Sequence, residues 1–221
     1  MARLGKKVGP YLLTSVVGAG FAGDIYRAVD TSPIDTSSKG PDVYALKCVR
    51  TRNLSHEQLM QIVVELYHHN MVSGCDYVLP LRGIIEKKSC VYIVFDLCET
   101  DMSKVIWKTG LYWRNEPLIK TAFLEVLDGV YACHQRGISH RDLRPENLMC
   151  NANGTGIQIR SFGLASSERA CGESGSRSPL CMSPGESFMV IHAPLTILTV
   201  LAVVENVGLM RRKTSCRTSG L

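Results

Sequence analysis

The residues most able to do chemistry in this 221-residue chain form one segment, His140-Arg141-Asp142-Leu143-Arg144-Pro145-Glu146-Asn147. A carboxylate such as that of Asp142 can accept the proton of a hydroxyl group. An amide five residues on, that of Asn147, can bind a divalent cation, and phosphoryl transfer needs both functions. The segment follows a helical pattern and precedes an apolar pair, which makes an accidental match on a polar loop the weaker interpretation.

A glycine-rich turn stands earlier in the chain, at Gly18-Ala19-Gly20-Phe21-Ala22-Gly23. Glycines let the backbone approach phosphate groups closely, with amide hydrogens directed at the anion. Alone, this spacing is weakly diagnostic, because hairpins often turn on glycine. The strand patterns on both sides argue against a dinucleotide-binding fold, in which a helix follows the glycines.

The first half of the chain predicts short strands with one inserted helix. Gln58 follows Ser55 by three residues, which indicates a capping box at the start of this helix. Glu65 lies at the border of its apolar stripe. The expected strands are 11–17, 24–29, 43–49, 78–85 and 90–97, a polar loop covers 31–42, and the stripe consists of Leu59, Ile62, Val63 and Leu66.

From Asn115 the apolar period becomes helical, and Gly137 stands where a C-terminal cap belongs. A long helix therefore leads directly into the His140 segment. Leu148-Met149 and Ile157-Gln158-Ile159 predict a short hairpin beyond it. The residues at helical spacing are Leu118, Ile119, Ala122, Phe123, Val126, Leu127 and Val130.

Composition excludes several classes of protein. The net charge of +5 is spread along the chain without a basic stripe among aromatics, which argues against nucleic-acid binding. Nine cysteines are scattered singly, which favours reduced thiols in the cytoplasm or nucleus. The N-terminus lacks the apolar segment of a secretory signal. The apolar run 188–204 has 17 residues, interrupted by His192 and Pro194, so a membrane anchor is the weaker interpretation of it.

The His140–Asn147 segment resembles the catalytic loop of eukaryotic protein kinases. The resemblance covers about residues 11–186, and its details are similar to fungal serine/threonine kinases of nutrient and meiotic control. It implies a two-lobed α+β fold with a complete antiparallel β lobe and an incomplete helical lobe. The corresponding divisions are an extension at 1–10, a first lobe at 11–98, a partial second lobe at 99–186 and an atypical tail at 187–221. The motifs with fungal character are Gly110-Leu111-Tyr112-Trp113-Arg114-Asn115, Leu118-Ile119-Lys120 and Cys133-His134 before Gly137-Ile138.

The same resemblance implies an ATP site. Lys47 and the glycine turn would hold the phosphates, with Glu65 as the partner of the lysine. Ala45 would leave room for the adenine, and the backbones of Asp96 and Cys98, beyond Phe95, would bind its edge. Asp101 would reach the ribose, and Met149 would form the floor of the pocket. The implied ATP-binding residues are Val17, Gly18, Gly20, Gly23, Ile25, Ala45, Lys47, Glu65, Asp96, Cys98, Asp101 and Met149.

Asp142, Arg144 and Asn147 would be the catalytic residues, with Asn147 also a magnesium ligand. Arg144 departs from the family, which usually has lysine there, and a planar guanidinium does not replace a compact ammonium. Ser161-Phe162-Gly163 departs further, because the family's metal-binding aspartate is a serine, and a hydroxyl is a poor ligand for magnesium.

The ending of the chain departs as well. Cys181-Met182-Ser183-Pro184-Gly185-Glu186 resembles the end of an activation segment with a glycine inserted, and the helices that follow in the family are not visible in 187–221. A reading-frame shift or retained intron near Gly185 would explain this ending.

The function expected from the resemblance is ATP-dependent phosphorylation of protein serine or threonine hydroxyls. One alternative is a catalytically impaired kinase or fragment that binds a nucleotide or a partner. A second alternative is a membrane-tethered interaction protein.

Overall fold

The computed structural model describes residues 3–20, 23–32, 42–52, 54–87 and 89–167. These residues form two compact units. The first comprises the described residues up to 64 and within 79–98, and the second comprises the described residues 65–78 and 99–167. The expected activation-segment ending and the apolar run 188–204 lie outside the described residues.

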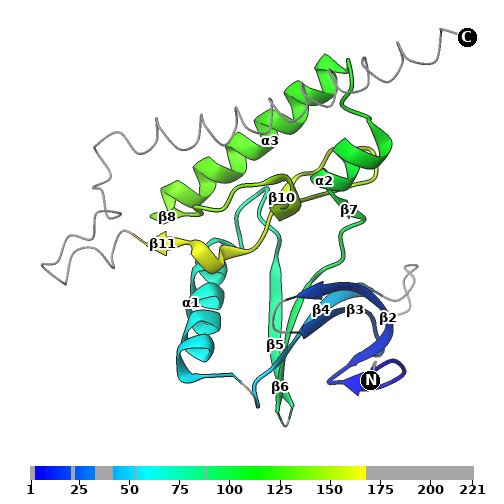
Figure 1. Ribbon diagram of the computed structural model, residues 1–221, viewed down its shortest axis with the longest axis vertical. Helices are drawn as coiled ribbons and strands as arrows, with labels where there is room; N and C mark the ends of the chain where they lie inside the picture. The colour runs from blue at the N-terminus through cyan, green and yellow to red at the C-terminus, as the bar shows by residue number, and fades with distance from the viewer. Residues whose placement is uncertain (1–2, 21–22, 33–41, 53, 88, 168–221) are drawn as a thin grey trace, which may run out of the picture. The chain divides into compact units, whose positions relative to one another are not determined.

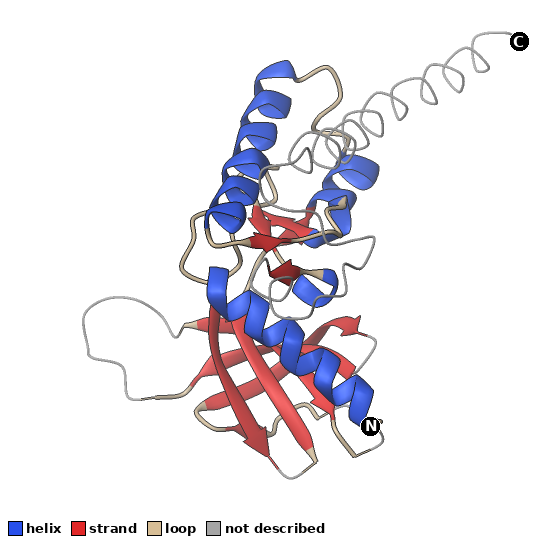
Figure 2. Ribbon diagram, turned by 90° about the vertical axis from the view of Figure 1, so that its left-hand side faces the viewer, coloured by secondary structure: helices blue, strands red, loops and turns tan. Residues whose placement is uncertain are grey.

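The first unit is built on an antiparallel sheet with strand order β1-β2-β3-β4-β6-β5 (Figures 1 and 2). Its core contains apolar side chains from five of the strands, together with Cys48 and Cys90. Leu13, Ala28 and Leu46 have no exposed surface. The strands are β1 (Lys7–Val8), β2 (Tyr11–Gly20), β3 (Gly23–Asp30), β4 (Val43–Arg50), β5 (Leu81–Lys87) and β6 (Cys90–Asp96).

The second unit contains the long helix α3 (Glu116–Gln135) and short elements around it. Asn115 caps α3 by accepting a hydrogen bond from the Leu118 amide, and the chain leaves the helix through Gly137 at φ +69°. Its other elements are α2 (Met102–Lys104), a π-turn at Val105–Thr109, β7 (Thr100–Asp101), β8 (Ile138–Ser139), β9 (Leu148–Cys150), β10 (Gln158–Ile159), β11 (Ser166–Ser167) and 3₁₀ turns at Pro145–Asn147 and Phe162–Leu164.

Helix α1 (His56–Val72) contributes residues to both units. The predicted capping box is confirmed, since the Gln58 amide donates to Ser55 Oγ and the Ser55 amide donates to Gln58 Oε1. The predicted stripe is wrong at Val63, which is 56% exposed. The fully buried positions lie near the end of the helix instead, at His68, His69 and Val72.

The five predicted strands with one inserted helix in the first half, and the hairpin of β9 with β10, are confirmed. Two details differ from the prediction. Lys7–Val8, expected in an N-terminal extension, forms β1 and buries Val8 in the sheet core. Strand β5 begins at Leu81, because Val78 instead bridges to Ile159 in the second unit.

Candidate active site

The predicted catalytic loop, His140–Asn147, is organised around the buried ring of His140. The Nδ1 atom of His140 accepts a hydrogen bond from the Asp142 amide at 3.2 Å, so a neutral ring carries its hydrogen on Nε2 and donates to the Arg160 carbonyl at 2.9 Å. Burial lowers the pKa of His140, against a smaller opposing effect of the Arg160 carbonyl, which favours this neutral form. His140 therefore fixes the backbone at Asp142.

The side chain of Asn147 holds Asp142 from the other side. Its Nδ2 atom donates to the Asp142 carbonyl at 2.8 Å and to Asp142 Oδ2 at 2.7 Å. Asn147 is 8% exposed, and its backbone bonds to the Arg144 carbonyl and the Arg160 amide. The carboxylate predicted to accept a hydroxyl proton is thus held in one orientation next to the predicted metal ligand.

Arg141 connects this loop to the segment that follows Phe162. The residue has φ +61°, and its guanidinium donates to the carbonyls of Leu164 and Ala165 at 2.6 and 3.4 Å. Arg144 behaves differently, because its Nε donates to Glu146 Oε2 at 3.0 Å on the exposed surface. An exposed pair of this kind contributes little to stability.

Phe162 anchors the Ser161-Phe162-Gly163 segment. Its ring is fully buried, with ring centroids 4.9 Å from His69 and 4.8 Å from His140. Glu65 lies beside this segment, since a β-carbon built on Gly163 would be 3.7 Å from Glu65 Oε2. Ser161 itself has left-handed backbone angles, φ 72° and ψ 67°, and its side chain does not cap the 3₁₀ turn that follows.

The residues around Ser161 do not fit a tightly bound magnesium ion. Magnesium is a hard cation that binds through oxygen ligands, chiefly carboxylates and phosphates. Within the described part of the chain, no group of three or more His, Cys, Asp or Glu residues could hold a metal ion. The amide of Asn147 and the hydroxyl of Ser161 are both neutral, so the predicted metal position has no carboxylate ligand from these two residues.

In the first unit the strand register brings the predicted phosphate-binding residues together. Gly18 pairs with Ile25 across the β2–β3 hairpin, and Ile25 pairs with Lys47 on β4. Ala45 lies two residues before Lys47 and therefore on the same face of β4. Gly23 is required by the packing, because a β-carbon there would lie 2.0 Å from the Cys48 carbonyl oxygen. Val17, at the same hairpin, is 47% exposed.

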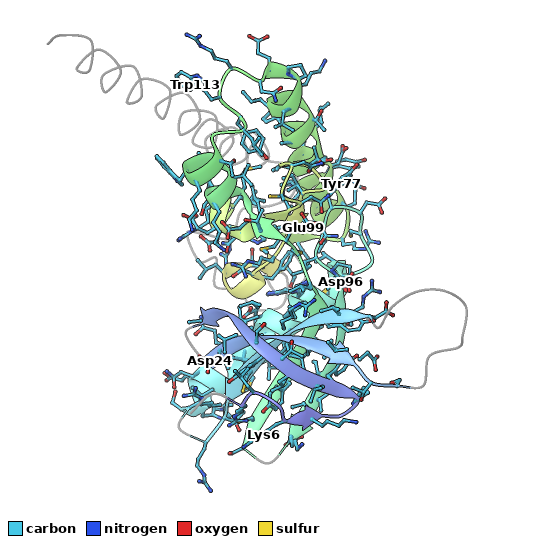
Figure 3. The ribbon with its side chains drawn as sticks, turned by 90° about the vertical axis from the view of Figure 1, so that its right-hand side faces the viewer. Lys6, Asp24, Tyr77, Asp96, Glu99 and Trp113 are labelled. Atoms are coloured by element: carbon cyan, nitrogen blue, oxygen red, sulfur yellow. The ribbon has the colours of Figure 1, made fainter. Side chains whose placement is uncertain are left out.

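Asp96 and Cys98, whose backbones were predicted to contact the adenine, lie at the end of the last segment of the first unit. The carboxylate of Asp96 accepts two hydrogen bonds from Arg82, at 2.6 and 2.7 Å. The carboxylate is thus paired, and the predicted adenine contact of this residue involves only its backbone. Figure 3 labels Asp96 and Asp24 on the first unit, and Glu99 and Tyr77 on the second.

Asp101 and Met149 face each other across β7 and β9 in the second unit. The carboxylate of Asp101 caps α2, accepting from the Lys104 amide at 3.0 Å and Ser103 Oγ at 2.8 Å, with Lys104 Nζ 2.8 Å away. Burial disfavours its charged form, but these hydrogen bonds outweigh burial and lower the pKa of Asp101. The structure thus gives this carboxylate a capping function beside its predicted ribose contact.

Sequence reasoning missed His69 and Arg160. His69 is four residues after Glu65, on the same face of α1, and that spacing could have identified it as a neighbour of Glu65. Arg160 precedes Ser161 and donates through Nε and Nη2 to the Glu146 carbonyl at 3.3 and 3.1 Å. The local sequence pattern does not predict that contact, because the contact depends on how the chain after β10 packs against the segment that contains Glu146.

Comparison with known proteins agrees with this geometry. The family model for the protein kinase domain matches residues 11–185, and the chain therefore belongs to the protein kinase family. It is 33% identical over 183 residues to a negative regulator of sexual conjugation and meiosis from Schizosaccharomyces pombe, a match that covers 82% of this chain and 37% of that protein.

Two further relatives are each 30% identical and are matched over 70% of this chain. One is a mitogen-activated protein kinase of Saccharomyces cerevisiae, of which 42% is covered, and the other is cyclin-dependent kinase 7 of Dictyostelium discoideum, of which 41% is covered. The chain spans about two fifths of the length of these curated relatives. None of the helices in the described residues is long and apolar enough to cross a membrane.

Proposed function

We propose that this chain binds ATP and transfers its terminal phosphoryl group to serine or threonine hydroxyls of proteins, at a rate held low by Ser161. The observation that carries the proposal is the pair formed by Asp142 and Asn147, whose 2.7 Å bond fixes the carboxylate in a loop that resembles the family's catalytic loop and lies within the residues matched by the family model. A fixed carboxylate is what a general base needs, because its direction determines whether it can reach the proton.

In the proposed reaction, the hydroxyl oxygen forms a bond to the terminal phosphorus while the bond to the leaving ADP oxygen breaks. The hydroxyl proton moves to the Asp142 carboxylate. Lys47 and the Gly18–Gly23 turn bind the phosphates of ATP, and the register that aligns Gly18, Ile25 and Lys47 supports this assignment. In the family, magnesium neutralises charge on the phosphates. Ser161 lacks the carboxylate that would hold magnesium in this chain.

A second candidate function is binding of a nucleotide or a partner with negligible transfer. The neutral side chain of Ser161 favours it, and so does Arg144, whose guanidinium is paired with Glu146 rather than left available for a phosphoryl group. The membrane-tethered alternative depends on residues 188–204, outside the described part of the chain.

Radiolabel transfer from ATP to a serine-rich protein such as casein separates the two candidates. The unmodified chain is compared with Asp142→Asn, which keeps the side-chain shape but removes the basic carboxylate. We expect the unmodified chain to exceed the variant by at least about tenfold, since a positioned general base contributes roughly 10²–10⁴-fold. Equal rates in the two proteins would contradict phosphoryl transfer and favour the second candidate.

A further inference from the structure

The backbone at Ser161 has the shape of a position that suits an aspartate. Left-handed angles are uncommon for residues other than glycine, and Asn and Asp adopt them several-fold more readily than most other residues. Ser161 has φ 72° and ψ 67°, and the ring of the next residue, Phe162, contacts His69 and His140. The segment therefore retains the conformation of a carboxylate position while the carboxylate is absent.

The serine at position 161 also changes the local charge, relative to the aspartate that the family has there. The two segments that meet there, 140–150 and 157–163, carry three arginines, Arg141, Arg144 and Arg160, against the carboxylates of Asp142 and Glu146. The carboxylate of Glu65 also lies beside Gly163, so the formal charges of these groups sum to zero. A carboxylate at position 161 would make this sum −1.

We propose that this chain binds ATP without a divalent cation, and that the serine at position 161 removes the requirement. The inference rests on the proposed ATP site. Free ATP is more negatively charged than its magnesium complex, so a carboxylate at position 161 repels the free nucleotide and attracts the complex. Serine removes both effects, and each of them shifts the preference toward the cation-free form.

Two substitutions separate charge from shape. Ser161→Asp supplies the carboxylate in a backbone conformation that aspartate tolerates. Ser161→Asn is the matched control, because asparagine has nearly the same shape and the same tolerance of left-handed angles but no charge. Both substitutions keep the contacts of Phe162, which makes misfolding a poor explanation for a difference between them.

The test measures ATP affinity by calorimetry for the whole chain and both variants, once with magnesium and once with a chelator. For the unmodified chain and for Ser161→Asn we expect dissociation constants that agree within about threefold between the two conditions. For Ser161→Asp we expect magnesium to tighten binding by at least about tenfold.

Magnesium tightening of the unmodified chain by more than about tenfold overturns the inference and leaves the proposed ATP site standing. Magnesium dependence in Ser161→Asn as strong as in Ser161→Asp overturns the assignment to charge. The absence of ATP binding in every protein and condition overturns the proposed function together with the inference.

Discussion

Replacing Asn147 with alanine tests how the catalytic loop is held. The substitution removes a hydrogen bond to the Asp142 carboxylate at 2.7 Å and another to its carbonyl at 2.8 Å, from a side chain that is only 8% exposed. A hydrogen bond to a charged group contributes about 1.5–3 kcal/mol and a neutral one about 0.5–1.5 kcal/mol. The free energy of opening this loop should therefore fall by about 2–4.5 kcal/mol.

Hydrogen–deuterium exchange of the amides in residues 142–147 measures that free energy locally. The Asn147 amide, bonded to the Arg144 carbonyl at 2.8 Å, reports most directly. A loss of about 2–4.5 kcal/mol corresponds to exchange that is roughly 30- to 2,000-fold faster, provided that the loop opens as a local unit.

Asn153→Ala is the matched control. The side chain of Asn153 also forms two hydrogen bonds, here as the acceptor from the Thr155 amide and Thr155 Oγ1, but it lies in an exposed turn. Water replaces such bonds, so the cost should stay below about 1 kcal/mol. Exchange in Asn147→Ala that is accelerated no more than about threefold would refute the reasoning, since the buried bonds would then contribute nothing to the loop.

Three further outcomes follow from burial and geometry. Burial lowers the pKa of His140 below its value in the unfolded chain, which is about 6.5. The folded state should therefore lose stability as the pH falls through about 6.5, because the unfolded chain then binds the proton more readily. An unchanged melting temperature between about pH 7.5 and pH 5.5 would contradict this. Gly23→Ala should lower the melting temperature far more than Gly83→Ala, because only the first places a β-carbon 2.0 Å from the Cys48 carbonyl oxygen. Equal shifts of the melting temperature would be inconsistent with the packing of β3 on β4. Val72 is fully buried, so Val72→Ala should lower the free energy of unfolding in denaturant by about 2 kcal/mol. Val63 is 56% exposed, so Val63→Ala should lower it by less than about 0.5 kcal/mol. The reverse order would show that the packing of α1 is misassigned.

Much of the local structure could be predicted because its signals are short in sequence. The capping box of α1 uses residues three apart, and the N-cap and C-terminal glycine of α3 mark both of its ends. The short strand patterns on both sides of the glycine turn predicted β2 and β3 for the same reason. The wrong assignment of Val63 has a physical cause, because α1 has apolar residues on more than one face and periodicity alone does not say which face is covered.

Contacts between distant segments could not be predicted in this way. Strand β1 has only two residues, too few to show a period, and Val8 is buried only because β2 pairs with it. Phe162 is recognisable from its motif, but its contact with His69 joins residues that are 93 positions apart in the printed sequence.

The central claim, that this member of the protein kinase family binds ATP through Lys47, is tested most directly by comparing ATP affinity of the unmodified chain with that of Lys47→Met. Lys120→Met, which removes an exposed lysine from α3, is the control for loss of a positive charge. We predict that Lys47→Met weakens ATP binding by at least about tenfold, corresponding to about 1.4 kcal/mol, while Lys120→Met changes it by less than about twofold. Equal ATP affinity in the unmodified chain and Lys47→Met would contradict the account.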